Sequence, residues 1–348
     1  MANDDIYGNK AVFERAAQNI DLFALPQEAR IKAIKERNLP DRKVGKYFCR
    51  NKENMPAFQK LFKHCENLDL SYPRRLRLMH SLKLILNSTS KSLTEIETKD
   101  QRDAINDICA KARETLNPAS FSYFITDIKY LWKMLYPVKD DRGRIDEKQT
   151  PYVVRHLSNK IDKSKQVMRG DRLSVDEYLK LLAACSDDVR LQAFVAIAYE
   201  SLGRPQEILS RKVGDVHLYD AYAQIDISSH GKEGIGILRV VDSYQYLVKL
   251  LETHPFKDDP KAFLFLNIGN TNQYDCMRPE NVNKMLRKRC QAIGIKKAIT
   301  AYSLKRNGVT DLRLRGTSDK EVQSRARWTT TKQLHTYDIA SQEESFKQ

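Results

Sequence analysis

Apolar residues recur at intervals of three and four positions through residues 56–137, a spacing that is typical of amphipathic helices. The repeat is carried by four segments, at residues 57–68, 72–86, 99–116 and 120–137. Pro73, Pro118 and Pro137 punctuate these segments, and a proline in the interior of a helix breaks or kinks it. We therefore predict a helical bundle over residues 52–138.

The segments on either side of this bundle have a different pattern. Residues 1–51 are polar, with short helical stretches and no apolar core of their own, which predicts an N-terminal helical extension. Residues 139–172 are rich in Lys and Arg and have almost no apolar periodicity. We expect this second stretch to be a linker whose positive charge suits it to lie along phosphate groups.

Residues 173–348 begin with a helical pattern. Ser174 and Glu177 have the spacing of a capping box, which predicts the start of a helix. A longer apolar helix follows, and we expect it to end at Gly203. A later helix with several basic residues is expected to close at Gly294.

Strand-like patterns interrupt these helices. Apolar and polar residues alternate in "AQIDIS" at 223–228 and in "GILRVVD" at 236–242. Alternation with period two indicates strands, and the glycine-containing "SHGKEGI" between them is typical of a tight turn. The predicted fold class is therefore mainly α with a small β-sheet (α+β), in which a helical domain precedes a mixed domain at 173–348.

The charge of the chain narrows the class of partner. Its 60 Lys and Arg against 45 Asp and Glu give a formal net charge of +15. This excess favours a polyanionic partner, nucleic acid ahead of a membrane surface, although a protein from a generally basic proteome would show it too. No apolar run approaches the roughly 20 residues of a membrane-spanning helix, and the N-terminus lacks a hydrophobic signal region. We expect a cytoplasmic protein without membrane contact.

The sequence contains no motif for a cofactor or a metal ion. Its six cysteines are far apart, without a C-x-x-C pair, so neither a zinc site nor a disulfide framework is indicated. The motifs of nucleotide hydrolysis, dinucleotide binding and zinc proteases do not occur. We predict that the protein uses no cofactor and no metal ion.

Four short motifs in the mixed domain carry candidate chemistry. In "SLGRPQEIL", Arg204 follows a helix and Glu207 comes three residues later. The motif "SSHGKEG" places Lys232 in the predicted turn, and "YSLKRNGVT" follows. The last, "RWTTTKQLHTY", has Trp328 nine positions before Tyr337. In this order and with this spacing, the motifs resemble those of the tyrosine recombinases, the phage integrase family.

The resemblance implies a helical core-binding domain at 52–138, a catalytic domain at 173–348, and site-specific recombination or integration of a mobile element. It implies that Tyr337 attacks a DNA phosphodiester and forms a covalent 3'-phosphotyrosine. Arg204 would bind two phosphate oxygens with its planar guanidinium group, and Lys232 would protonate the departing oxygen. The family works as four protomers on DNA, so double-stranded DNA and further copies of the chain are the implied partners.

The third motif departs from the family pattern, usually written H-x-L-R. Tyr302 and Lys305 stand where histidine and arginine are usual. A lysine supplies charge without a bidentate fork, and a tyrosine cannot act as a cation. Arg306 is the alternative phosphate contact, although successive helical residues point about 100° apart. The resemblance also makes Trp328 a catalytic residue, which would pack and donate a hydrogen bond to the phosphate. Glu207 and Arg306 would be supporting residues, and Glu207 would orient Arg204.

Each of these residues also has an ordinary structural interpretation. Arg204 could cap a helix or form a surface ion pair, and Lys232 could be a solvated turn residue. Trp328 could belong to the core with its N–H satisfied, and a tyrosine such as Tyr337 near a C-terminus is usually packing material. The order of the motifs, more than any single residue, favours the catalytic interpretation.

Two other functions stay open at the level of sequence. A type IB topoisomerase-like enzyme would use the same chemistry to relax DNA without pairing two sites. The residues after Tyr337 suit a tail that docks on a neighbouring protomer, which favours a recombinase. A non-catalytic DNA-binding protein derived from a recombinase would account for the departures at Tyr302 and Lys305.

Overall fold

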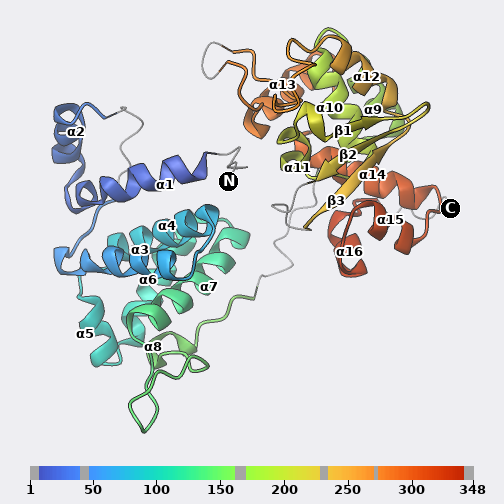
Figure 1. The fold of residues 1–348 in the computed structure, drawn as a ribbon. Helices are drawn as coiled ribbons and strands as arrows, with labels where there is room; N and C mark the ends of the chain where they lie inside the picture. Colours follow the sequence, from blue (N-terminus) through green and yellow to red (C-terminus); the bar gives the residue numbers. More distant parts are fainter. Residues whose placement is uncertain (1–7, 40–46, 161–169, 228–233, 270–272, 341–348) are drawn as a thin grey trace. The chain divides into compact units, whose positions relative to one another are not determined.

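The computed structural model describes residues 8–39, 47–160, 170–227, 234–269 and 273–340 (Figure 1). These residues form two compact units, one within residues 8–160 and one within residues 170–340. Each unit has an apolar core of its own, so each is described by itself.

The first unit is built from helices packed around α4. Its helices are α1 (Asn9–Gln18), α2 (Gln27–Glu36), α3 (Pro56–Asn67), α4 (Tyr72–Ser88), α5 (Leu93–Thr98), α6 (Arg102–Thr115), α7 (Pro118–Leu135) and α8 (Tyr152–Arg155). Helices α3, α6 and α7 all contact α4, and Phe58, Leu82 and Trp132 are fully buried between them. Prolines lie in the first turns of α3, α4 and α7, where their missing N–H costs no hydrogen bond.

A buried carboxylate fixes α7 against α4. Asp127 is 1% exposed and accepts hydrogen bonds from Arg77 Nη2 and Ser81 Oγ, both at 2.8 Å. A buried charge is tolerated only when it is paired and hydrogen-bonded, and both conditions are met here. The apolar periodicity of the sequence therefore describes the helices but misses this polar contact between them.

Residues outside the expected bundle also belong to this core. Phe23 lies in the segment expected as a separate extension. Its ring nevertheless packs edge-on against the ring of Phe58, with 5.8 Å between the two ring centres. Val153 and Val154 of α8 lie within the stretch expected as a linker, and both are fully buried. Two adjacent valines in a polar stretch form no helical period, so the sequence pattern could not assign them. The division of the chain into four segments that the sequence predicts stays a prediction.

The second unit combines helices with a small sheet. Its elements are α9 (Val175–Ala183), α10 (Val189–Glu200), α11 (Pro205–Leu209), β1 (Val216–Leu218), β2 (Ala223–Ile227), β3 (Gly236–Val240), α12 (Tyr244–Glu252), α13 (Pro279–Ala292), α14 (Ala301–Leu314), α15 (Asp319–Arg325) and α16 (Leu334–Tyr337). The described strands form an antiparallel sheet in the order β1-β2-β3. Ile225 pairs with Val216 on one side and Leu238 on the other, and Ile225 and Leu238 face the core.

Most of the predicted elements of this unit are confirmed. Ser174 caps α9 in a capping box with Glu177, and Gly294 follows α13 with φ of 76°. Strands β2 and β3 occupy the two alternating segments; the turn between them, with Lys232, lies outside the described residues. The apolar helix ends at Glu200 rather than at Gly203, and the left-handed residue after it is Leu202, with φ of 54°. The predicted fold class, mainly helical with a small sheet, is confirmed.

Close packing of α14 on α10 positions the C-terminal part of this unit. A Cβ atom added to Gly308 in α14 would collide with the carbonyl oxygen of Tyr199 in α10, so only glycine permits this approach. Figure 1 shows α14, α15 and α16 grouped beside the β2–β3 end of the sheet. The approach brings α14 next to the segment after α10, where Arg204 lies.

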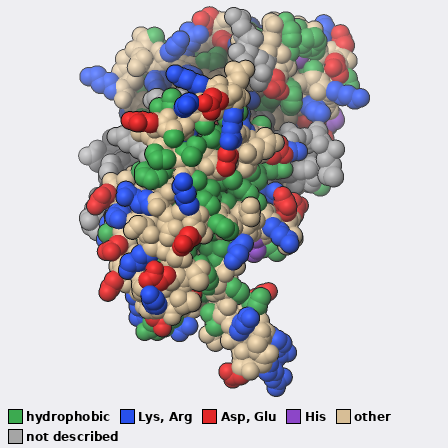
Figure 2. All heavy atoms as spheres, turned by 90° about the vertical axis from the view of Figure 1, so that its left-hand side faces the viewer, with side chains coloured by type: hydrophobic (Ala, Val, Ile, Leu, Met, Phe, Trp, Pro, Cys, Tyr) green, Lys and Arg blue, Asp and Glu red, His purple; other side chains and the backbone are tan. Residues whose placement is uncertain are grey.

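The surface carries charges of both signs. On the face drawn in Figure 2, Lys and Arg side chains are interspersed with Asp and Glu and with apolar side chains. The net charge of +15 is therefore not gathered into one continuous patch on this face. Within the described ranges, no helix has both the length and the apolar character needed to cross a membrane.

Candidate active site

A short helix fixes Arg204 and Glu207 together. Pro205 occupies the first turn of α11, and the Arg204 backbone N–H donates to Glu207 Oε2 at 2.9 Å. The guanidinium Nη1 of Arg204 donates to Oε1 of the same carboxylate at 3.1 Å. Both residues are buried, so one carboxylate holds the backbone and the side chain of Arg204 in a single arrangement.

Helix α14 directs Lys305 and Arg306 to different surroundings. The Lys305 ammonium lies 5.5 Å from the ring centre of Trp328 and 5.4 Å from that of Tyr337, within cation–π range. Arg306 forms an ion pair with the buried carboxylate of Asp171. Because neighbouring helical residues are rotated by about 100°, only one of the two cations faces the tyrosine. Lys305 is that cation.

Tyr337 lies at the end of α16 against two other aromatic side chains. Its hydroxyl oxygen is 3.2 Å from the hydroxyl of Tyr302, and its ring centre is 4.9 Å from that of Trp328. Arg204 also forms a hydrogen bond with Tyr337. The Trp328 indole N–H is buried and, within the described part of the chain, has no hydrogen-bond partner. An indole donor left in this position can serve a ligand that enters the site.

The surroundings of Tyr337 keep its phenol protonated at neutral pH. Burial, followed by the hydrogen bond and the charge interaction with Tyr302, raises the pKa of Tyr337 to about 12. Arg204 opposes both by lowering the same pKa. The tyrosine therefore needs further positive charge, or an acceptor for its proton, before it can act as a nucleophile.

The structure thus brings six of the expected side chains into one site, namely Arg204, Glu207, Tyr302, Lys305, Trp328 and Tyr337. Arg306 pairs with Asp171 instead, with its guanidinium carbon 6.0 Å from the ring centre of Tyr302, and Lys232 lies outside the described residues. Among the described residues, no group of three or more His, Cys, Asp or Glu is placed to hold a metal ion. The catalytic roles of the six residues stay predictions.

One residue of the site was missed by the sequence analysis. The Arg327 guanidinium lies 3.7 Å from the Glu207 carboxylate, measured from Nη1 to Oε2. Arg327 is the first residue of the motif "RWTTTKQLHTY", but an arginine is ordinarily a surface residue, so the sequence analysis gave it no role. Its importance depends on a backbone conformation that the sequence pattern does not report.

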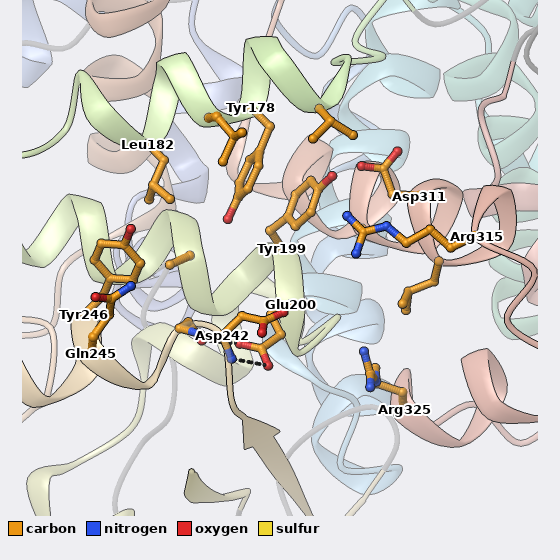
Figure 3. A pocket seen from close by; sticks show the side chains of 16 residues that line it. Tyr178, Leu182, Tyr199, Glu200, Asp242, Gln245, Tyr246, Asp311, Arg315 and Arg325 are labelled. Carbon is orange, nitrogen blue, oxygen red and sulfur yellow. Dashed lines mark hydrogen bonds between the residues drawn. The ribbon is translucent and has the colours of Figure 1, made fainter. Parts of the chain in front are cut away.

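A separate cavity of about 290 Å³ lies elsewhere in the second unit (Figure 3). Helices α9, α10, α12, α14 and α15 contribute to its wall. Tyr178 and Tyr199 stack at 3.7 Å on one side, and Glu200 accepts hydrogen bonds from backbone N–H groups at the start of α12 on the other. None of the six predicted site residues lines this cavity, so the tyrosine site is distinct from it.

Comparison with known proteins bears on the family and the fold. The sequence profile of the phage integrase family matches residues 171–344. The XerH site-specific recombinase bound to a palindromic difH substrate is similar with a TM-score of 0.61 and 15% identity, covering 95% of each chain. A lambda integrase dimer bound to a COC' core site has a TM-score of 0.59 and 16% identity, over 82% of this chain and 96% of that one.

The Tn1549 transposon integrase in complex with transposon right end DNA has a TM-score of 0.60 and 12% identity, over 83% of this chain and 96% of that one. No curated protein sequence matches the chain. At these identities the structural likenesses show a shared fold, while the sequence profile, which spans half of the chain, shows the family. The chain belongs to the phage integrase family of tyrosine recombinases, as its motifs predicted.

Proposed function

We propose that this protein is a site-specific DNA recombinase or integrase that cuts and rejoins DNA through a covalent 3'-phosphotyrosine on Tyr337. The observation that carries the proposal is the convergence of Arg204, Lys305 and Tyr302 on this one tyrosine. A tyrosine held only for packing does not need a cation over its ring and an arginine and a second phenol at its hydroxyl group. The family and the fold support the same chemistry.

In the proposed cleavage step, Tyr337 Oη attacks a phosphorus atom of the DNA backbone. A bond forms between Oη and phosphorus, and the bond from phosphorus to the 5' oxygen breaks. The phenol proton leaves through the Tyr302 hydroxyl, 3.2 Å away, to water. The departing 5' oxygen takes a proton from Lys232, a role that rests on the resemblance alone.

Arg204 and Lys305 would stabilise the charge that develops on the phosphate oxygens. Arg204 is pre-oriented by Glu207 and can grip two oxygens, whereas Lys305 acts as a point charge. Both are buried, and electrostatic interactions are stronger where water is excluded. The proposal therefore assigns charge neutralisation to side chains of this protein instead of a metal ion.

The phosphotyrosine conserves the energy of the broken bond, so that the 5' hydroxyl of another strand can reverse the attack without ATP. Strand exchange between two sites requires several protomers on DNA. A lambda integrase tetramer bound to a Holliday junction is similar to this chain, with a TM-score of 0.60 and 16% identity. We propose the same kind of assembly here, on duplex DNA of a mobile element, in the cytoplasm. In that assembly the first unit would serve as the core-binding domain.

Two alternative functions are separated from this one by experiment. A type IB topoisomerase-like enzyme would form the same adduct but would not exchange strands between two sites. A non-catalytic DNA-binding protein would bind DNA and form no adduct. The ordered contacts of Lys305 and Tyr302 with Tyr337 favour an active enzyme over the non-catalytic alternative.

The test begins with duplexes selected for binding from a random pool. A recovered duplex is nicked next to the cleavage position, so that the released fragment diffuses away and the covalent adduct accumulates. We expect the wild-type protein to form an adduct that survives denaturing electrophoresis. Failure to form an adduct on any selected duplex would contradict the catalytic proposal.

A further inference from the structure

Tyr337 lies on a helix that is too short to be stable by itself. Helix α16 has only four residues, Leu334–Tyr337, and Asp338 follows it in extended backbone, with φ of -69° and ψ of 121°. Starting a helix costs more conformational entropy than one turn of hydrogen bonds returns. Contacts with the rest of the unit must therefore hold the tyrosine in its place.

This turn is anchored at its start and just after its end. Leu334 is 2% exposed and belongs to a small apolar cluster that includes Val309 and Trp328. Beyond Tyr337, the Asp338 carboxylate accepts a hydrogen bond at 2.5 Å from Nη1 of Arg313. The apolar contact holds the first residue of the turn, and the ion pair holds the residue that follows the tyrosine.

Helix α14 supplies several contacts along this segment. Tyr302 lies 3.2 Å from the Tyr337 hydroxyl, and Thr310 Oγ1 accepts a hydrogen bond at 3.0 Å from the backbone N–H of Ile339. Arg313, one turn further along α14, binds the carboxylate between them. Tyr302 and Arg313 are 11 residues apart, which is about three helical turns, so both lie on one face of α14. The segment after α16 is thus docked along that face.

Arg313 lies between two carboxylates that belong to different segments. Its Nη1 pairs with Asp338, and its Nε lies 3.4 Å from Oδ1 of Asp319 in the first turn of α15. The Asp338 side chain is 19% exposed and that of Asp319 is 56% exposed, so solvent weakens the pair with Asp338 less. Of these two carboxylates, only Asp338 adjoins the tyrosine in the chain.

We propose that Asp338 is a positioning residue, whose ion pair with Arg313 holds Tyr337 docked in the active site of its own chain. This inference rests on the proposed function, because it assumes that Tyr337 is the nucleophile. It adds two residues that lie outside the four sequence motifs. Asp338 acts through the placement of Tyr337 and makes no contact with the phosphate.

The ion pair changes how often the nucleophile is in place. An attacking atom contributes to the rate only while it is held close to the reacting centre. Without the pair, a single helical turn and its apolar contact would hold the tyrosine less of the time, while Arg204 and Lys305 would still bind the phosphate. Because the contacts of this segment are made within one chain, docking should not require DNA.

The test uses variants that remove one charge at a time. Asp338→Asn keeps the size of the side chain, and its amide oxygen can still accept the hydrogen bond from the Ala340 backbone N–H. Asp319→Asn removes the other carboxylate from the same arginine and is the matched control. Arg313→Gln removes the cation itself, and the double variant with Asp338→Asn completes a double-mutant cycle.

Each variant is measured in two ways. Single-turnover cleavage of the nicked duplex is followed with protein in excess, beside a titration of DNA affinity. The Tyr337 ring is followed by nuclear magnetic resonance in DNA-free protein that contains ¹³C-labelled tyrosine. Its signal is assigned by its loss in Tyr337→Phe. In the docked arrangement the Trp328 ring, centred 4.9 Å away, shifts this signal from that of an exposed tyrosine.

We expect Asp338→Asn to slow cleavage by about tenfold, the effect of losing one charge-assisted hydrogen bond, with DNA affinity nearly unchanged. Its Tyr337 signal should move towards the position of an exposed tyrosine. Arg313→Gln should shift the signal in the same way, and the double variant should be no slower than the slower single variant. Asp319→Asn should behave like the wild type in both measurements. A merely structural role would leave the Tyr337 signal in place.

Three results would overturn the positioning role while leaving the proposed function standing. These are cleavage by Asp338→Asn at the wild-type rate, an unchanged Tyr337 signal in that variant, and equal effects of Asp338→Asn and Asp319→Asn. Absence of an adduct from the wild-type protein would instead overturn the proposed function, and this inference with it. The wild-type reaction therefore distinguishes the two failures.

Discussion

The different surroundings of Lys305 and Arg306 predict two different kinds of mutational defect. Lys305 is fully buried beside Trp328 and Tyr337, where the phosphate would enter. Arg306 is paired with the buried carboxylate of Asp171. We therefore expect Lys305→Met to impair cleavage and Arg306→Met to impair stability.

The magnitudes follow from the surroundings of each side chain. A hydrogen bond to a charged group contributes about 1.5–3 kcal/mol, and each 1.36 kcal/mol is a factor of ten in rate. Lys305→Met should therefore slow single-turnover cleavage by about tenfold to about 150-fold, while the methionine fills most of the space left by the lysine. Arg306→Met leaves the Asp171 carboxylate buried without its cation, which costs about 3–5 kcal/mol of stability.

Both quantities are measured for both variants, with cleavage followed on the nicked duplex and stability by urea denaturation. The double variant with Arg306→Met and Asp171→Asn is the control, because it removes both charges of the buried ion pair and should recover part of the lost stability. If Arg306→Met slows cleavage by folded protein while Lys305→Met does not, the orientation of α14 described here is wrong. If neither variant affects cleavage, this motif is not part of the active site.

Three further predictions concern the site and the DNA. Tyr302→Phe removes one of the interactions that raise the pKa of Tyr337. The alkaline limb of the cleavage pH profile should therefore move to lower pH. An unchanged profile would argue against contact between the two phenols during the reaction. Lys232→Ala should slow cleavage far more on a substrate whose leaving atom is the natural 5' oxygen than on one in which sulfur replaces that oxygen, because sulfur departs without a proton. Equal losses on the two substrates would remove Lys232 from the role of general acid. DNA affinity should fall steeply between low and physiological salt, as measured by titration, whereas a flat response would count against several phosphate contacts.

The sequence predicted the elements whose signal is local. Helical periodicity, the capping box at Ser174 and the alternation in β2 and β3 are short-range patterns, and the structure confirms them. The motif order also predicted which family the chain belongs to. It left the choice between Lys305 and Arg306 open, because both lie on one helical turn and only the packing of α14 decides which faces Tyr337.

Other features depended on contacts that no local pattern contains. Arg327 enters the site because its backbone is left-handed and Gly236 leaves space for its guanidinium, a match between residues 91 positions apart. Val153 and Val154 complete the first unit's core from a stretch that is otherwise polar. The early end of α10 reflects a leucine, Leu202, in a conformation usually reserved for glycine. Packing against residues that are distant in the sequence holds these side chains and backbone conformations in place, and local sequence patterns do not report such packing.

The central claim is that Tyr337 forms the covalent bond with DNA, and peptide mapping of the trapped adduct tests it most directly. The adduct from the nicked duplex is digested with protease and nuclease, and the peptide that retains a nucleotide is sequenced by mass spectrometry. The account predicts that the modified residue is Tyr337 and that Tyr337→Phe forms no adduct while binding the same duplex with nearly unchanged affinity. A nucleotide on any other residue, or an adduct that persists in Tyr337→Phe, would contradict it.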